Sequence, residues 1–106
     1  MYARRVSMQL KPNSVSEFTQ KLERQVIPLL RKQTGFQDEI TFIGPGNTRA
    51  FGISLWENKE NADTYNRNTY AEVTKLLAGV VEGTPEVESY DVCNSTFHKI
   101  AVHATA

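Results

Sequence analysis

The sequence predicts an α+β fold in which four antiparallel strands form one sheet and two helices cover one of its faces. Three observations lead to this prediction: four stretches have the composition or alternation of strands, two others carry apolar residues at helical spacing, and the stretches follow a particular order. That order, strand, helix, strand, strand, helix, strand, is the ferredoxin-like βαββαβ arrangement. A chain of 106 residues is long enough for one such domain.

The first strand and the first helix come at the start of the chain. Residues 2–10 alternate between two faces, as a strand does. Ser14 and Glu17 have capping-box spacing and mark the start of a helix. Pro28 should kink this helix and Gly35 should end it. The buried stripe of the helix consists of Phe18, Leu22, Val26, Leu29 and Leu30.

Two further strands form a hairpin in the middle of the chain. Residues 36–43 predict a strand with Ile40 and Phe42 on one face, and residues 44–47 have the composition of a hairpin loop. The returning strand, over residues 51–56, alternates most clearly. One of its faces carries Phe51, Ile53 and Leu55, and the other carries Gly52, Ser54 and Trp56.

The second helix is expected over residues 58–82 and is interrupted. Thr69 and Glu72 repeat the capping-box spacing, so the helix should restart near Tyr70. Residues 83–85 contain glycine and proline and should end it.

The last strand is expected over residues 86–94. Residues 1–94 then form a single domain, and residues 95–106 form a C-terminal tail. This tail is either a further short strand or a frayed end, and we favour a short ordered segment that lies on a partner subunit.

The predicted sheet has one face that the chain itself does not cover. Each helix has a single apolar stripe, so both helices can cover the same face and nothing remains for the other. Continued alternation would place Arg5, Ser7, Ser54 and Trp56 on the uncovered face. A large aromatic residue on a bare sheet face favours burial against another surface. We therefore expect a two-fold homodimer that packs sheet against sheet.

Charge and composition argue against several classes of function. Twelve basic and twelve acidic residues cancel, so neither nucleic acid nor a membrane is an expected partner. The first residues lack the apolar core of a signal peptide and Cys93 is the only cysteine, which together indicate a cytoplasmic protein. His98 and His103 fall on opposite faces of an extended segment, so no metal site is expected.

Three motifs link the chain to a known family. They are residues 52–57 leading into a helix, residues 26–30 followed by Gly35 and Phe36, and residues 85–90 opening the last strand. With these motifs the chain resembles the antibiotic biosynthesis monooxygenase (ABM) domain family of the dimeric α/β-barrel superfamily, over roughly residues 2–93. The resemblance implies a homodimer with one cavity per subunit between sheet and helices. The family includes cofactor-free oxygenases of aromatic polyketides, haem-degrading enzymes and quinol oxygenases.

The resemblance carries over to the family's site residues only in part. Trp56 matches the tryptophan of the family's strand. Gly52 stands where the polyketide oxygenases have an asparagine, and Ala62 where they have a tyrosine. Arg5 and Asn66 stand where the haem-degrading members have an asparagine and a haem-ligating histidine. Haem degradation is therefore not expected, and no cofactor is expected either.

Five side chains are candidates for binding a substrate: Trp56, Arg5, Tyr65, Asn66 and Tyr70. Trp56 either stacks on a planar substrate or fills space in the packing. Arg5 either binds an anionic or phenolate oxygen or pairs with a carboxylate across the dimer. Tyr65 and Tyr70 flank the helix break, where they either shape a pocket mouth or pack. Asn66 is placed to orient a substrate by hydrogen bonds.

Two functions fit these observations. The first is a cofactor-independent monooxygenase that acts on a small aromatic or quinol-type compound. The second is a non-catalytic dimeric module that binds a small hydrophobic or aromatic ligand. A polar group near Trp56 that can act as a general base or stabilise an oxyanion favours the enzyme, whereas an entirely apolar cavity favours the binding module.

Overall fold

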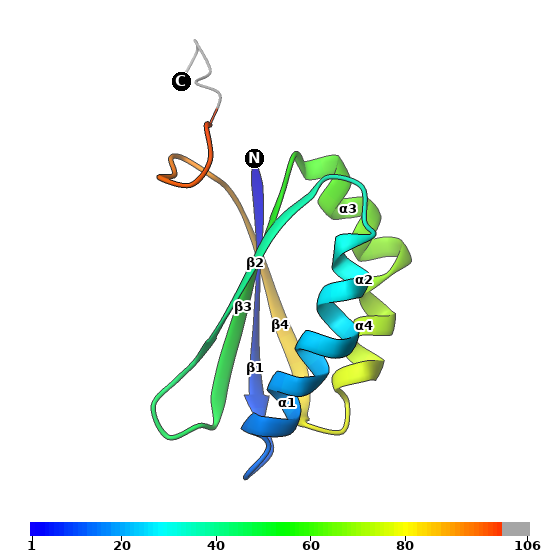
Figure 1. Cartoon of the computed structure of the whole chain (residues 1–106), viewed down its shortest axis with the longest axis vertical. Coiled ribbons are helices and arrows are strands. Elements are labelled where there is room, and N and C mark those ends of the chain that lie inside the picture. The colour runs from blue at the N-terminus through cyan, green and yellow to red at the C-terminus, as the bar shows by residue number, and fades with distance from the viewer. Residues whose placement is uncertain (101–106) are drawn as a thin grey trace.

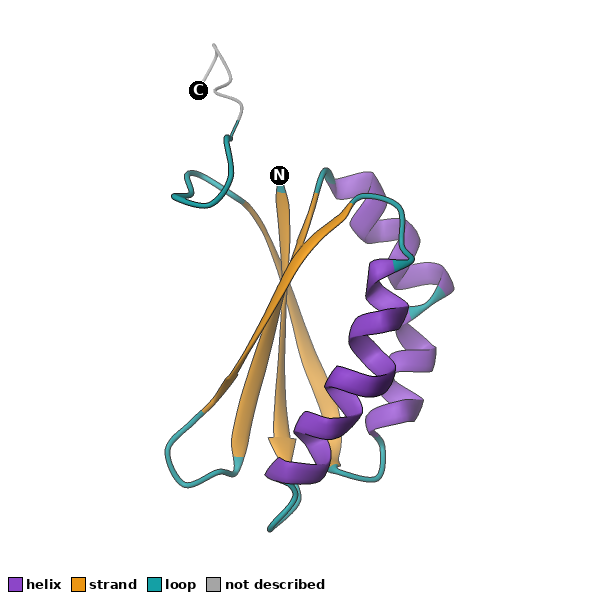
Figure 2. Cartoon of the chain, in the orientation of Figure 1, coloured by secondary structure: helices purple, strands orange, loops and turns teal. Residues whose placement is uncertain are grey.

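The computed structural model describes residues 1–100 and contains one antiparallel sheet with helices on one face (Figure 1 and Figure 2). The sheet has four strands in the spatial order β2-β3-β1-β4. They are β1 (Tyr2–Leu10), β2 (Phe36–Ile43), β3 (Arg49–Trp56) and β4 (Val81–Asp91). Each neighbouring pair is antiparallel. The predicted ferredoxin-like fold class is therefore confirmed.

The first helical region contains a π-helical turn. It comprises α1 (Val15–Lys21), the π-helix η1 (Leu22–Val26) and α2 (Ile27–Arg31). The amide of Ile27 donates a hydrogen bond to the carbonyl of Leu22, five residues back rather than four. Pro28 follows directly and has no amide hydrogen, which interrupts α-helical bonding at this point. The disturbance predicted at Pro28 thus takes the form of a wider turn just before it.

The second helical region is divided in two, as predicted. It comprises α3 (Lys59–Asn68) and α4 (Tyr70–Leu77), separated at Thr69. Asn58 caps α3, because its side-chain oxygen accepts a hydrogen bond from the amide of Asn61 at 2.9 Å.

Neither predicted capping box forms. The hydroxyl of Ser14 donates to the carbonyl of Pro12 at 3.3 Å, and the hydroxyl of Thr69 donates to Oε1 of Gln33 at 3.1 Å. Neither side chain accepts a hydrogen bond from an amide of its helix. Both hydroxyls have found other partners, and the Thr69 contact ties the α3–α4 break to the end of the first helical region.

The second helix ends earlier than predicted and β4 begins earlier. The helix ends at Leu77, not at residue 82, and β4 begins at Val81. Val80 and Val81 are both buried, so their apolar side chains resemble a continuation of the helical stripe. Residues 83–85 belong to β4, where the pairing with β1 shifts register. This strand is at the edge of the sheet, and an edge strand tolerates a proline and an irregularity.

The prediction that Arg5 and Ser7 share a face with Ser54 and Trp56 is wrong. Alternation shows which residues of one strand share a face, but it does not fix the register between strands. In the structure, Arg4 lies opposite Ser54, and Arg5 lies opposite Ile53. Ser54 and Trp56 are buried on the helix-covered face, whereas Arg5 and Ser7 lie on the uncovered face.

The uncovered face is more apolar than predicted. Ile40 and Phe42 of β2 are 46% and 43% exposed. They lie opposite Ile53 and Phe51 of β3, and the rings of Phe42 and Phe51 stack with their centroids 4.7 Å apart. The region also includes Arg5, whose guanidinium lies 4.6 Å from the centroid of Phe51. A face of this kind is a candidate interface.

The chain after β4 forms no helix or strand up to residue 100. The ring of His98 contacts the carboxylate of Asp38 on β2, and Phe97 is 82% exposed. His103 and the rest of residues 101–106 lie outside the described residues. The placement of the tail on a partner subunit stays a prediction.

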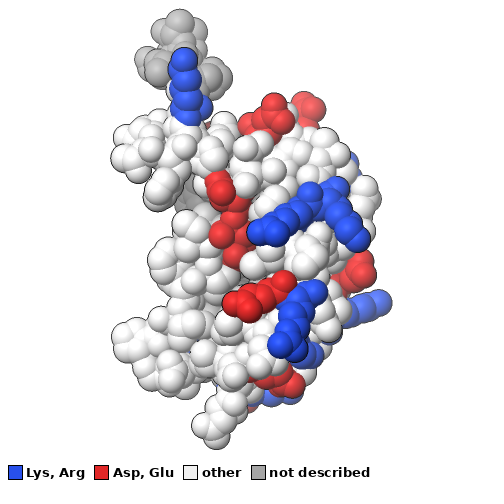
Figure 3. Space-filling model, viewed as in Figure 1, with Lys and Arg blue, Asp and Glu red and all other residues white. Residues whose placement is uncertain are grey.

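Charges of both signs are interspersed over the face that Figure 3 shows, with no large region of one sign. Within residues 1–100, no helix has the length and apolar character that a membrane crossing requires.

The core predicts a large effect of removing Trp56. This side chain is fully buried, its ring stacks on Tyr65 with centroids 4.9 Å apart, and it meets Phe36 edge-on at 5.6 Å. We expect Trp56→Ala to lower the free energy of unfolding by about 3–5 kcal/mol. The exposed Phe97→Ala should change it by less than about 0.5 kcal/mol. Urea denaturation measures both, and similar losses in the two variants would contradict this account of the core.

Candidate active site

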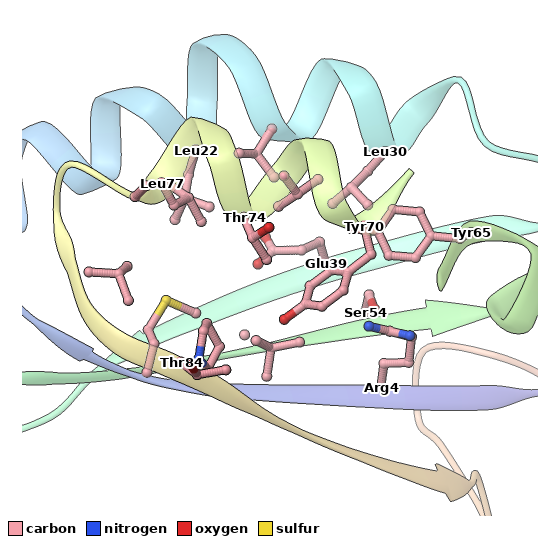
Figure 4. A pocket seen from close by; sticks show the side chains of 18 of the residues that line it. Arg4, Leu22, Leu30, Glu39, Ser54, Tyr65, Tyr70, Thr74, Leu77 and Thr84 are labelled. Atoms are coloured by element: carbon pink, nitrogen blue, oxygen red, sulfur yellow. The ribbon is translucent and has the colours of Figure 1, made fainter. Parts of the chain in front are cut away.

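A cavity of about 390 Å³ lies between the helices and the sheet. This volume is within the range of small-molecule sites. Most of its wall is apolar and comes from the helices and strands together, including Leu22, Val26, Leu30, Val73, Leu77, Val6 and Met8. The polar part of its wall is smaller and includes Arg4, Glu39, Ser54, Tyr65 and Tyr70, as Figure 4 shows. The cavity is thus an apolar chamber with a few polar groups.

Arg4 of β1 is the most unusual of these groups. It is only 4% exposed. Its Nη1 donates to the side-chain oxygen of Asn66 at 2.8 Å, but its Nε and Nη2 are buried and have no hydrogen-bond partner among the described residues. No carboxylate within residues 1–100 lies within 4.0 Å of its guanidinium. Burial lowers the pKa of Arg4 below its usual range, because the charged form is desolvated.

Two tyrosine rings from the helices enclose the guanidinium of Arg4. Its central carbon lies 5.3 Å from the ring centroid of Tyr65 and 4.8 Å from that of Tyr70. Such contacts with aromatic rings stabilise a cation that has no carboxylate partner. Burial raises the pKa of the Tyr65 hydroxyl to about 12 and also raises that of Tyr70, so both phenols are neutral at physiological pH.

Trp56 packs against Tyr65 and so supports this arrangement. It is fully buried and stacks on Tyr65, and its indole nitrogen donates to the hydroxyl of Ser54 at 2.9 Å. Trp56 is not among the residues that line the cavity. Of the two roles considered for it, packing is therefore the one that the structure shows.

Glu39 of β2 lines the same cavity. The hydroxyl of Thr41, two residues along the strand, donates a hydrogen bond to its carboxylate. Burial raises the pKa of Glu39 above its ordinary value, and the hydrogen bond from Thr41 offsets part of this effect. Glu39 lies opposite Ser54, which in turn lies opposite Arg4. A carboxyl group and a guanidinium therefore stand on the same side of the sheet, two strands apart.

The comparisons with known proteins identify the fold. No family model and no curated protein matches the sequence. Among solved structures, a protein from Bordetella bronchiseptica, provisionally named an antibiotic biosynthesis monooxygenase, is 18% identical, with a TM-score of 0.74 over 88% of this chain and 97% of that chain. SnoaB, a cofactor-independent oxygenase from Streptomyces nogalater, is 11% identical, with a TM-score of 0.73 over 90% and 95%. The chain has the ABM fold.

A third similar structure shows that this fold does not specify one activity. A protein of unknown function from Nitrosomonas europaea is 14% identical, with a TM-score of 0.73 over 96% of this chain and 95% of that chain. At these identities the likeness shows the ABM fold, and the reaction has to be argued from the site.

The structure brings together some of the predicted site residues. Tyr65 and Tyr70 line the cavity of this ABM fold, and Asn66 accepts the hydrogen bond from Arg4. Arg5 lies on the other face of the sheet, where its Nη1 is 3.6 Å from the carboxylate of Glu88 in the same chain. Within one chain, Arg5 therefore has a carboxylate neighbour, and its two predicted roles stay predictions.

Sequence reasoning missed Arg4 and Glu39. Arg4 had a usable signal, because alternation places it on the same face of the first strand as Val6, Met8 and Leu10. Glu39 also had a usable signal: Ile40 and Phe42 share one face of β2, so residues 39 and 41 must share the other. Once the apolar face of β2 is assigned to a partner, Glu39 must point toward the helices.

The described residues hold no group of three or more histidine, cysteine, aspartate or glutamate side chains arranged to bind a metal ion.

The raised pKa of Glu39 predicts that its ionised form lowers the stability of the folded state at high pH. The folded state binds the proton of this carboxyl more tightly than the unfolded state does. The resulting stabilisation is present below the ordinary glutamate pKa and is lost as pH rises through the raised pKa. We expect Glu39→Gln to be more stable than the wild type near pH 8, with the difference shrinking toward pH 4. Thermal unfolding across this range measures it, with the exposed Glu60→Gln as the control; a difference that does not change with pH would contradict the prediction.

Proposed function

We propose that the protein is an ABM-family enzyme, a cofactor-independent monooxygenase that acts on a small aromatic compound with an ionisable hydroxyl group, such as a phenol or quinol. The observation that carries this proposal is the buried guanidinium of Arg4, which belongs to the wall of an apolar cavity. Its Nε and Nη2 have no hydrogen-bond partner among residues 1–100. The shared fold with SnoaB, a cofactor-independent oxygenase, supports the reaction class.

Arg4 is suited to hold an anionic oxygen. A buried charge without a counter-ion is costly, and removing it from water is compensated only if strong hydrogen bonds replace the lost ones. Nε and Nη2 of Arg4 are the two atoms that lack such bonds. A phenolate or enolate oxygen would accept from both and would neutralise the charge. The neutral form of the same substrate would gain less, so Arg4 favours the ionised form.

The apolar remainder of the cavity suits an aromatic ring. Leu22, Val26, Leu30, Val73 and Leu77 enclose the volume from the helix side. The ring of Tyr70 extends toward the middle of this space in Figure 4. A planar hydrophobic molecule would bury its rings among these side chains while its oxygen meets Arg4. Exclusion of water strengthens the electrostatic interaction and protects reactive intermediates.

The proposed reaction balances without an added reductant. The substrate loses a proton and becomes an electron-rich anion, which supplies an electron pair to dioxygen and forms a carbon–oxygen bond. The peroxide that results takes up a proton. The carbon that bears the peroxide then loses its hydrogen, and the oxygen–oxygen bond breaks. These changes give a carbonyl group and water. Both electron pairs come from the substrate, one oxygen atom enters the product, and the other leaves as water.

Oxygen consumption with a panel of naphthols, anthrones and quinols tests the function. We expect the wild type to consume oxygen with at least one compound, and Arg4→Met to lower kcat/KM by about 10²-fold, because it removes the anion-stabilising donors. Arg5→Met is the matched control on the opposite face and should stay within about threefold, since it touches no cavity group. Tight binding of a panel compound without oxygen consumption would contradict the proposal and support the non-catalytic binding module.

We also propose that the enzyme is a homodimer that packs through the uncovered face of its sheet. The exposed side chains of Ile40 and Phe42, with Phe51 stacked beside them, support this arrangement. The resemblance to the ABM family points to the same assembly. Burial of these side chains in a two-fold interface would remove a large apolar surface from water.

The dimer predicts that one charge on the uncovered face separates the subunits. We expect Phe42→Glu to convert the protein into a species of 12.0 kDa, and the wild type to sediment at twice that mass. Ala71→Glu places the same charge on the exposed surface of α4 and should leave the dimer intact. Analytical ultracentrifugation at micromolar concentration measures all three. A monomeric wild type would overturn the assembly but not the reaction.

A further inference from the structure

The carboxyl group of Glu39 occupies space that exists because residue 52 is glycine. A Cβ atom built on Gly52 would lie 3.2 Å from Oε1 of Glu39 and 3.4 Å from the hydroxyl oxygen of Thr41. The distance to Glu39 is shorter than most packed atoms show, so a Cβ atom at this position would push the carboxyl away by a few tenths of an ångström. The backbone of Gly52 does not have a positive φ angle, unlike that of Gly35, Gly46 and Gly83. Space, and not backbone conformation, is therefore what glycine provides here.

The carboxyl group is held but not neutralised. Thr41 donates a hydrogen bond to it, and within residues 1–100 no lysine, arginine or histidine lies within 4.0 Å of it. It faces the same cavity as Arg4, with Ser54 between them on β3. Strands are spaced by about 4.8 Å, so the two backbones are separated by roughly 10 Å. Both side chains line the same cavity, so one small substrate can contact both.

We propose that Glu39 is the general base that takes the proton from a substrate bound to Arg4. This inference rests on the proposed function and adds the residue that starts the reaction. The proton passes from the hydroxyl group, or from an acidified carbon–hydrogen bond, to a carboxylate oxygen of Glu39, and the electron pair stays on the substrate. The same proton is then available to the peroxide, so the carboxylate is regenerated in each cycle.

The electrostatics of the cavity agree with this role. Burial moves the pKa of Glu39 toward neutrality, where a general base is most effective. The other titratable groups of the cavity wall are Arg4 on β1, Tyr65 on α3 and Tyr70 on α4. The pKa values of both tyrosines are raised, and Arg4 remains a cation at neutral pH even though its pKa is lowered. Of these four groups of the cavity wall, Glu39 is the one carboxyl.

Steady-state kinetics of Glu39→Gln test the proposal. The amide has the same shape but accepts no proton, so we expect kcat to fall by about 10²-fold or more while KM changes little. The wild-type rate should decline as pH falls through the raised pKa of Glu39, and this acidic limb should be absent from the residual activity of the variant. Glu60→Gln, on the exposed surface of α3, is the matched control and should keep both the rate and the limb. A Glu39→Gln rate within threefold of an active wild type would overturn the assignment of Glu39 as the general base and leave the proposed function standing.

Substitution of Gly52 or Thr41 tests the position of the Glu39 carboxyl separately from its ability to accept a proton. Gly52→Ala should displace the carboxyl and lower kcat about tenfold, with the acidic limb retained because the base is still present. Thr41→Val should have a smaller effect of the same kind, since it removes only the hydrogen bond that holds Glu39. Loss of the acidic limb in Gly52→Ala would contradict the assignment of that limb to Glu39.

A binding measurement tests the base even if no oxygen is consumed. 4-Nitrophenol shows by its absorbance whether it is bound as the phenolate. In the wild type the proton should pass to Glu39, so phenolate formation should release almost no proton into the solution. In Glu39→Gln, the same phenolate signal should be accompanied by release of about one proton per bound molecule. Calorimetry in buffers of different ionisation enthalpy measures this difference. Equal proton release in both proteins would overturn the proposal, whereas the expected difference without oxygen consumption would leave the base and remove the monooxygenase.

Discussion

The register between β1 and β3 is the constraint on which the rest of the site depends. It places Arg4 opposite Ser54, on the helix-covered face. A slip of one residue would reverse the faces of β1, so Arg5 would enter the core and Arg4 would leave it. The two arginines are neighbours in sequence with the same chemistry, yet one is 4% exposed and the other lies at the surface, paired with Glu88. Their difference in function therefore follows from backbone pairing and not from residue type.

Side chains from both α3 and α4 stabilise the buried guanidinium of Arg4. Asn66 of α3 accepts one hydrogen bond, and Tyr65 and Tyr70 supply aromatic rings on either side of the α3–α4 break. The break brings both tyrosines to the same guanidinium, because a continuous helix would turn residues five apart away from each other. Trp56 in turn fixes Tyr65 by stacking. The interruption at Thr69, which looks like a defect in the helix, is thus part of the site.

The sequence allowed the fold to be predicted more completely than the site. The period of two in the strands and the apolar stripes of the helices gave the order of elements, and Asn58 correctly marked the start of the second helical region. Gly35 has the predicted positive φ, although α2 ends earlier, at Arg31. These are local signals. The faces of Arg5 and Trp56 were not predicted correctly relative to each other, because register is a non-local property that the alternation of one strand does not contain. The boundary near Val80 failed for a related reason, since a buried turn and a buried helix have the same apolar composition.

Glu39 and Gly52 show how a site on a common fold can change without changing the fold. The resemblance to the ABM family implies an asparagine at the position of Gly52 in the polyketide oxygenases. Here β3 contributes no side chain at residue 52, and the vacated volume adjoins a carboxyl that β2 supplies from the next position across the sheet. A carboxylate differs from an amide in that it accepts a proton. The exchange therefore alters what the site can do chemically while the sheet, its helices and the cavity remain as they are.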